Sequence, residues 1–353
     1  MKTIFPILTR LACSLLSVFS TLASVAAQTD IPVSVRAVTP ATVGNPAEST
    51  AATPSTPDGA PEQPPSQLIL QQAIQRLDRI PSIAARVRHR VQLFDQQLTG
   101  TGAYEQFDDD FGRKTRLELR ISVGDRPTSL LEVCDGRFLW SHRDVIAIDD
   151  QGDELPDIRR VDLRLARRAL AVYGPAYMSP LQPQITVGGL PLLIGQLNDA
   201  FVFGKLAETK LHGVPVWVIS GTWRPRALER IWAAIDQQQD DTERLSAKDA
   251  AERGPDQLPA PFPHSALIAF GKDDLFPYRI EYLRQEGEGG DTGETSIVTM
   301  EFFEVRLGAT IDPMRFVYQP GNATILDDTE SYLGQFGISR QQVERIRAAR
   351  GNE

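Results

Sequence analysis

The chain has 353 residues and a formal net charge of -9 at neutral pH, with two cysteines, Cys13 and Cys134. The negative charge argues against nucleic acid as a partner and against broad electrostatic docking on an anionic membrane. The four histidines are scattered and form no metal-binding pair at short spacing, so the sequence predicts no metal site and no cofactor.

Residues 1–27 have the pattern of a secretion signal. Lys2 and Arg10 precede an apolar stretch dotted with serine, and a run of small residues that suits signal peptidase ends at Ala27. The apolar stretch is too short and too rich in serine to span a membrane well, so we expect cleavage after Ala27. The mature chain would then be periplasmic or secreted, without a transmembrane span. A lipid anchor on Cys13 is the weaker alternative, because Arg10 stands where such a motif has leucine.

The mature chain would divide into a linker and one folded domain. Residues 28–65 are rich in proline, alanine, serine and threonine, so this segment cannot bury enough apolar surface to fold and is expected to be a disordered linker. Residues 66–353 form the domain, with a polar insertion near 236–263 that we expect to be exposed. Only Cys134 remains after cleavage, so no intramolecular disulfide can form and the fold depends on its core.

The domain begins with a helix and then changes to strands. Ser66 is expected to cap a helix that runs to Ile80, because apolar residues recur there at helical spacing. From Ile83 the period becomes two, which predicts a half-buried strand with a row of arginines on its wet face and His89 on its apolar face. The sequence TGTG at 99–102 predicts a bend.

The rest of the domain reads mainly as hairpins with helices inserted midway. Asp135-Gly136 and His212-Gly213 are hairpin turn signals between apolar runs. The count is eight to eleven antiparallel strands. The remaining expected elements are strands at 115–123 and 296–307, a third hairpin around 272–274, and helices at 158–170, 190–197 and 338–349.

Several local patterns resemble the LolA-like family of periplasmic lipoprotein carriers. They are the leading helix followed by an arginine-rich strand, the charged strand GRKTRLEL at 112–119, the hairpin CDGRFLW at 134–140 and the closing segment FVYQP at 316–320. The resemblance implies an α+β fold in which a curved antiparallel sheet forms an incomplete (half) β-barrel closed by α-helices over an apolar cavity. It implies lipid acyl chains or a lipoprotein as the ligand, bound without covalent chemistry.

The candidate site is the set of apolar side chains expected on the inner face of that sheet. A wide curved sheet cannot fill its concave side from its own side chains, so helices or a ligand must do so. The alternative for each residue is ordinary core packing against the helices. The set is Val87, Val91, Leu93, Leu117, Leu119, Ile121, Val216, Val218, Phe270, Tyr278, Ile280 and Phe303.

The sequence leaves two alternatives to this carrier. The first alternative is a structural or adaptor protein of the cell envelope, with a sheet filled by its own helices and a protein partner. A hydrolase is the least favoured, because the paired aspartates at 108–110 and 149–150 read as solvated turns and Cys134 lies beside Asp135, which would raise its pKa. Arginines at 159, 160, 164, 167 and 168 form a basic cluster, read either as one wet helix face or as a docking site for an acidic partner or lipid headgroup.

Overall fold

A computed structural model describes the chain over residues 65–93, 96–110, 112–123, 126–148, 154–174, 185–238, 253–259, 262–286 and 293–350. Within these ranges one sheet of twelve strands has the order β12-β6-β5-β4-β3-β2-β1-β11-β10-β9-β8-β7. Neighbouring strands are antiparallel except for β12, which pairs with β6 in parallel. The expected secretion signal, nearly all of the linker and much of the polar insertion lie outside the described residues.

The elements follow in a simple order along the chain. The strands are β1 (Ser82–Leu93), β2 (Gln96–Asp109), β3 (Gly112–Val123), β4 (Arg126–Cys134), β5 (Phe138–Ile148), β6 (Glu154–Asp162), β7 (Phe201–Leu211), β8 (Val214–Trp223), β9 (Ser265–Gly271), β10 (Pro277–Glu286), β11 (Gly293–Leu307) and β12 (Ile325–Asp327). The helices are α3 (Pro65–Arg79), α4 (Leu163–Tyr173), α5 (Gly189–Ala200), α6 (Pro225–Gln238), α8 (Thr329–Gly334) and α9 (Arg340–Arg350), with 3-10 turns η1 (Pro255–Gln257) and η2 (Pro313–Phe316).

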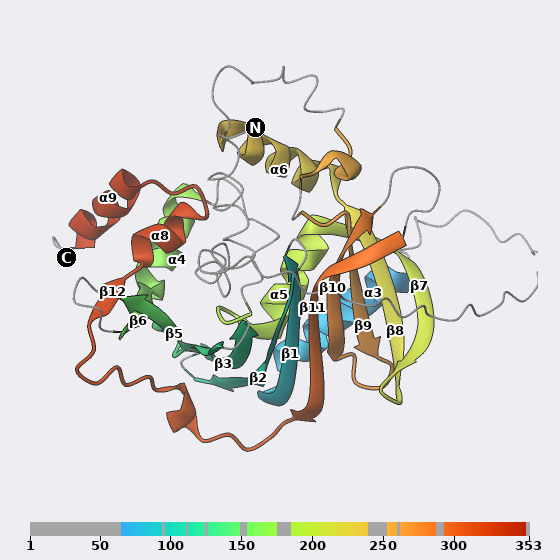
Figure 1. The fold of residues 1–353 in the computed structure, drawn as a ribbon, viewed down its shortest axis with the longest axis horizontal. Helices are drawn as coiled ribbons and strands as arrows, with labels where there is room; N and C mark the ends of the chain where they lie inside the picture. Colours follow the sequence, from blue (N-terminus) through green and yellow to red (C-terminus); the bar gives the residue numbers. More distant parts are fainter. Residues whose placement is uncertain are drawn as a thin grey trace, which may run out of the picture.

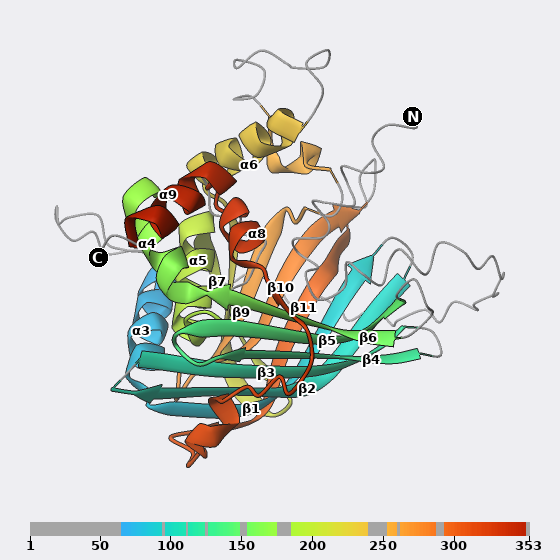
Figure 2. The same ribbon diagram turned by 90° about the vertical axis from the view of Figure 1, so that its left-hand side faces the viewer.

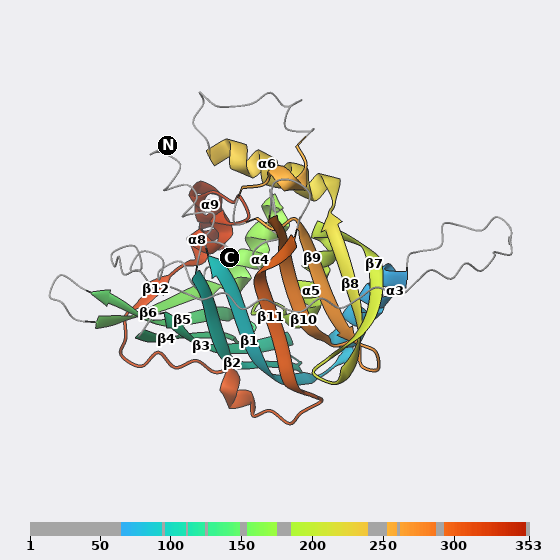
Figure 3. The same cartoon turned by 45° about the vertical axis from the view of Figure 1, so that its right-hand side comes forward.

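The sheet is strongly curved and open, with β7 at one edge and β12 at the other (Figures 1 and 3). α3 and α5 lie inside the curve and pack on each other, and α6 lies across one end of it. α4, α8 and α9 form a second helical group near β5 and β6 (Figure 2). The structure therefore confirms the predicted fold class: an α+β half-barrel with helices on the concave side of a curved sheet.

The helix α3 forms where the sequence predicted it, but Ser66 has a different role. Leu70, Ala73 and Leu77 recur at helical spacing and are completely buried in the main core. Ser66 lies inside the first turn instead of preceding it, and its hydroxyl donates a 2.8 Å hydrogen bond to the carbonyl of Phe203 in β7. The predicted cap is therefore wrong, since this buried serine connects the helix to an edge strand.

The predicted bend at 99–102 is also wrong, because β2 runs straight through it. Gly102 pairs with Val87 on one side and Leu119 on the other. A Cβ atom at Gly102 would lie 1.7 Å from the carbonyl oxygen of Glu118. Glycine here permits a close approach of two strand backbones rather than a change of direction.

The predicted helix at 158–170 is a strand followed by a shorter helix. Residues 158–162 pair with β5 as the end of β6, and α4 starts at Leu163. Asp162 is the N-cap, and its Oδ1 accepts hydrogen bonds from the backbone N–H groups of Arg164 and Leu165. The aspartate thus marks the change from extended to helical backbone that the apolar spacing alone did not reveal.

The described end of the polar insertion packs on the core. α6 extends to Gln238, and residues 239–252 and 260–261 lie outside the described part. Leu258 and Phe262, which follow, are buried in the main core with exposed fractions of 1% and 3%. This portion of the segment therefore contributes to the hydrophobic core.

The convex face of the sheet carries charge, as the alternation in β1 predicted. Arg88 and Arg90 stand on this face and form ion pairs with Glu301 of β11, at 3.6 and 3.1 Å. His89 points the other way and is buried. Phe316 of η2 is buried in a smaller cluster on the outer side, so part of the convex face is covered by the chain that leads to β12.

Candidate functional site

The residues predicted to line a cavity in the sheet are mostly core residues packed near α3 and α5. The members found in the main core are Val87, Val91, Leu117, Leu119, Ile121, Phe270 and Ile280, with Tyr278 half-buried against it. Val216 is buried outside that cluster, and Val218 is half-buried. Phe303 is half-buried below the guanidinium of Arg88, and the side chain of Leu93 is outside the described part.

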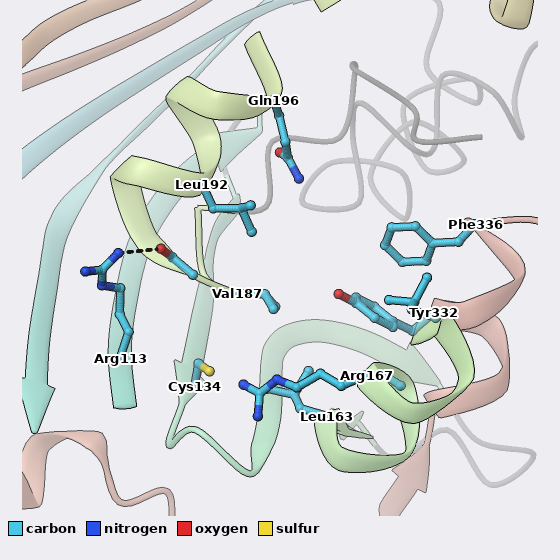
Figure 4. Close-up of a pocket in the computed structure, with 12 residues that line it drawn as sticks. Arg113, Cys134, Leu163, Arg167, Val187, Leu192, Gln196, Tyr332 and Phe336 are labelled. Atoms are coloured by element: carbon cyan, nitrogen blue, oxygen red, sulfur yellow. Dashed lines mark hydrogen bonds between the residues drawn. The ribbon is translucent and has the colours of Figure 1, made fainter. Parts of the chain in front are cut away.

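A pocket of about 420 Å³ lies beside this core, between α4, α5, the α8 segment and the end of β4. Its lining is largely apolar, with arginines and a glutamine among the polar groups (Figure 4). The apolar lining residues are Leu163, Ala166, Leu170, Val187, Leu192, Tyr332 and Phe336, together with Cys134. Pockets that bind small ligands typically enclose roughly 300–1,000 Å³, so this one is of suitable size.

The spacing of residues in α4 builds one wall of the pocket. Leu163, Ala166 and Leu170 recur at helical intervals and share one face, and Arg167 stands on the same face. The capped start of α4 at Asp162 fixes where this face begins. The helix therefore presents an apolar wall that contains one cation.

The opposite wall is the start of α5, which two threonines and a glutamine hold in place. Thr115 of β3 donates its hydroxyl to the carbonyl of Thr186, and the Thr186 hydroxyl donates to Glu132 at 3.0 Å. Gln106 accepts the backbone N–H of Leu190 at 3.2 Å through its side-chain oxygen. Burial raises the pKa of Glu132. These bonds join three strands to the residues that enter the helix.

Two glycines allow the chain to enter α5 at this angle. Gly188 and Gly189 have φ values of 123° and 70°, a backbone region that disfavours side chains. A Cβ atom at Gly189 would lie 2.2 Å from the side-chain oxygen of Gln106. Glycine is therefore needed here for both the turn and the close contact.

Arg113 lies at the base of the pocket, and its guanidinium is hydrogen-bonded to several residues. Its guanidinium donates to both carboxylate oxygens of Asp108, at 2.8 and 2.6 Å, and to Asp78 at 3.2 Å. It also donates to the carbonyl of Gly188 at 3.2 Å. The hydrogen bonds with Asp108 raise the pKa of Arg113. This arginine serves mainly to connect β3 to the start of α5.

Arg167 differs from Arg113 in what it contacts. Its guanidinium donates to the carbonyl of Gly136 at 3.1 Å, and no carboxylate of the described residues lies within ion-pair distance. Figure 4 shows its side chain reaching along the pocket toward Cys134 and the side on which Arg113 lies. The charge of Arg167 is thus not balanced by a described acidic group.

Cys134 forms part of the pocket floor and is not an activated nucleophile. The side chain is 2% exposed, and burial is the main cause that raises the pKa of its thiol, with Asp135 adding to the effect. The sequence predicted this direction from Asp135. A thiol of raised pKa is mostly protonated near neutral pH and is therefore a weak nucleophile.

The described residues contain no group of three or more histidine, cysteine, aspartate or glutamate side chains placed to hold a metal ion. None of their helices combines the length and apolar character needed to cross a bilayer.

Comparison with known proteins gives distant likenesses in fold. No protein-family model matches the sequence, and no curated protein matches it. Similar solved structures include the MucA/MucB complex of Pseudomonas aeruginosa (10% identity, TM-score 0.35, 72% of this chain and 61% of that one) and the lipoprotein LppX of Mycobacterium tuberculosis (9%, 0.32, 71% and 99%). A LolA superfamily protein from Nitrosomonas europaea is also similar (12%, 0.23, 72% and 97%).

The chain spans about 60% of the length of the MucB structures that it matches, 61% and 60% in the two cases. A member of the LolA superfamily, which the sequence resembles, is thus among these similar solved structures. The class of this protein is defined by its own sheet: an open α+β half-barrel with a helix-walled pocket beside it.

Most of the pocket was not predicted from the sequence. Its walls come from segments far apart in the chain, so no local motif marks it. One signal was present: Arg167 belongs to the basic cluster and falls on the apolar face of α4, where a charge is unexpected. Two other members of the cluster are placed elsewhere, since Arg159 pairs with Asp157 at 2.9 Å and Arg160 stacks on Phe138.

Proposed function

We propose that this protein is an exported carrier that binds a lipid acyl chain, free or attached to a lipoprotein, by apolar burial and without a covalent step. The observation that supports the proposal is the 420 Å³ pocket with its mainly apolar lining. The site differs from the one expected at first, because the acyl chain would lie between helices rather than against the middle of the sheet.

The pocket of about 420 Å³ lies toward the lower end of the roughly 300–1,000 Å³ range of small-ligand pockets, so it suits about one acyl chain. Each methylene moved out of water contributes about 0.8 kcal/mol, which gives a gross gain of about 8 kcal/mol for ten of them. Association costs offset part of this gain, so we expect modest, reversible binding, as a carrier requires.

A second function is favoured by the packing of the sheet. Phe201, Phe203 and Phe276 are among the largest completely buried side chains and belong to the main core. A half-barrel filled by its own side chains and helices suits an adaptor of the cell envelope that binds a protein partner on its surface. This reading predicts that an apolar ligand does not enter the protein.

An added side chain inside the pocket tests the carrier proposal. Leu192 of α5 points into the pocket in Figure 4 and is 39% exposed, so Leu192→Trp should fill the cavity while the protein still folds. We expect this variant to lose at least tenfold in affinity for a fluorescent single-chain lipid. The matched control is Val172→Trp on α4, which is 59% exposed and outside the pocket lining. Equal uptake by both variants, or no uptake by the wild type, would reject this site.

A further inference from the structure

We infer that the pocket selects a single-chain amphiphile with an anionic head group, and that Arg167 receives that head group. The inference rests on the proposed carrier function and adds the charge of the ligand to it. Three observations support it: the position of Arg167 on α4, the balance of charge around the pocket, and the start of α5 in the pocket wall.

The first observation is that Arg167 interrupts an apolar helix face. It is one turn beyond Leu163 and one turn before Leu170, and both of these leucines line the pocket. The stem of an arginine can cover apolar surface while its guanidinium reaches a polar group at the edge. A ligand with an apolar tail and a polar end would match this division within one pocket.

The second observation is that the two arginines of the pocket lining differ in their anionic partners. Arg113 is neutralised by two carboxylates, Asp108 and Asp78. Arg167 has only the carbonyl of Gly136 among its described partners. The nearby Asp135 directs its Oδ1 to the backbone N–H groups of Arg137 and Phe138, so that oxygen is engaged in the hairpin turn. The pocket wall therefore carries one cation without a described anionic partner.

The third observation is that α5 begins in the same wall. Gly188, its N-cap, lines the pocket and offers no side-chain cap. The amino end of a helix carries partial positive charge, and here only this dipole acts on an anion, because the N–H of Leu190 is donated to Gln106 and Pro191 has none. The planar guanidinium of Arg167 suits either a carboxylate or a phosphate. The head group would thus be that of a fatty acid or of a single-chain phospholipid.

The test compares four amphiphiles that share one tail. Dodecanoate, dodecyl phosphate, 1-dodecanol and dodecyltrimethylammonium are titrated below micelle formation into the purified full chain at neutral pH. We expect at least one anion to bind about ten- to a hundredfold more tightly than the alcohol, because hydrogen bonds to charged groups are among the strong ones. The tighter of the two anions identifies the head group.

Two variants assign the preference to Arg167. Arg167→Gln should remove the advantage of the anion over 1-dodecanol. Arg164→Gln, also exposed on α4 but outside the pocket lining, is the matched control and should behave as the wild type. If the anion and the alcohol bind equally, or Arg167→Gln keeps the preference, the head-group inference fails while the carrier stands. If no amphiphile binds, both proposals fail.

Discussion

At the scale of single residues, burial decides chemistry more than residue type does. His89 and Cys134 are the kinds of side chain that suggest catalysis, yet both are buried and uncharged near neutral pH by the direction of their pKa shifts. The sequence predicted both cases correctly, because alternation placed His89 on an apolar face and Asp135 adjoined the cysteine. The pocket beside Arg167 was not predictable, since its other walls come from α5 and α8.

The buried His89 should make stability depend on pH. Burial lowers its pKa to about 4, while an unfolded histidine titrates near 6.5. The unfolded chain therefore binds the proton more readily, and stability present above pH 6.5 is lost as the pH falls toward 4. The loss approaches roughly 3 kcal/mol for this group. Urea unfolding across that range measures it, and His89→Gln should flatten the dependence by that amount; an unchanged slope would contradict the assignment.

Leu119 separates a core role from a cavity role in the sheet. It is 2% exposed and packed in the main core, so Leu119→Asp would bury an uncompensated charge and should prevent stable folding. Far-ultraviolet circular dichroism and thermal unfolding provide the measurement. A variant that folds normally but no longer takes up lipid would instead place the binding site in the sheet.

At the scale of elements, helices and strands with regular spacing were predictable, and their junctions were not. The hairpins at Asp135-Gly136 and His212-Gly213 were predicted because the turns are local, and φ values of 87° at Gly136 and Gly213 agree with their turn roles. The glycines of β2 were predicted to form a bend, because the sequence does not show that a neighbouring strand passes close to them. The entry to α5 was likewise hidden, since it depends on contacts with β2, β3 and β4.

The strand β2 should be sensitive to any added side chain at its close approach. Gly102→Ala would place a methyl group within 1.7 Å of the Glu118 carbonyl oxygen, so we expect a loss of about 3 kcal/mol in the free energy of unfolding. The control is Gly204→Ala in β7, where no atom lies within 4 Å and the change should stay below about 0.5 kcal/mol. Similar small effects from both substitutions would show that the strands can separate to make room.

At the scale of the whole molecule, the sheet supports the fold and the helices form the pocket. α3 and α5 help to fill the concave side, so the half-barrel is a support whose interior is largely occupied. The second helical group leaves a pocket against α5, and α5 therefore faces both the core and the pocket. The antiparallel strands were predictable from alternation and hairpin turns, and the half-barrel from the resemblance to LolA-like proteins. The pocket was not, because it exists only where α4, α5 and α8 meet.

The most direct test of the carrier is to identify what the protein holds when it is purified gently. Native mass spectrometry of the full chain, followed by organic extraction, should find one single-chain lipid or acylated peptide bound per protein, and Leu192→Trp should lack it. An unliganded mass for the wild type, with no uptake of an added apolar fluorophore, would contradict the carrier and favour the self-filled adaptor.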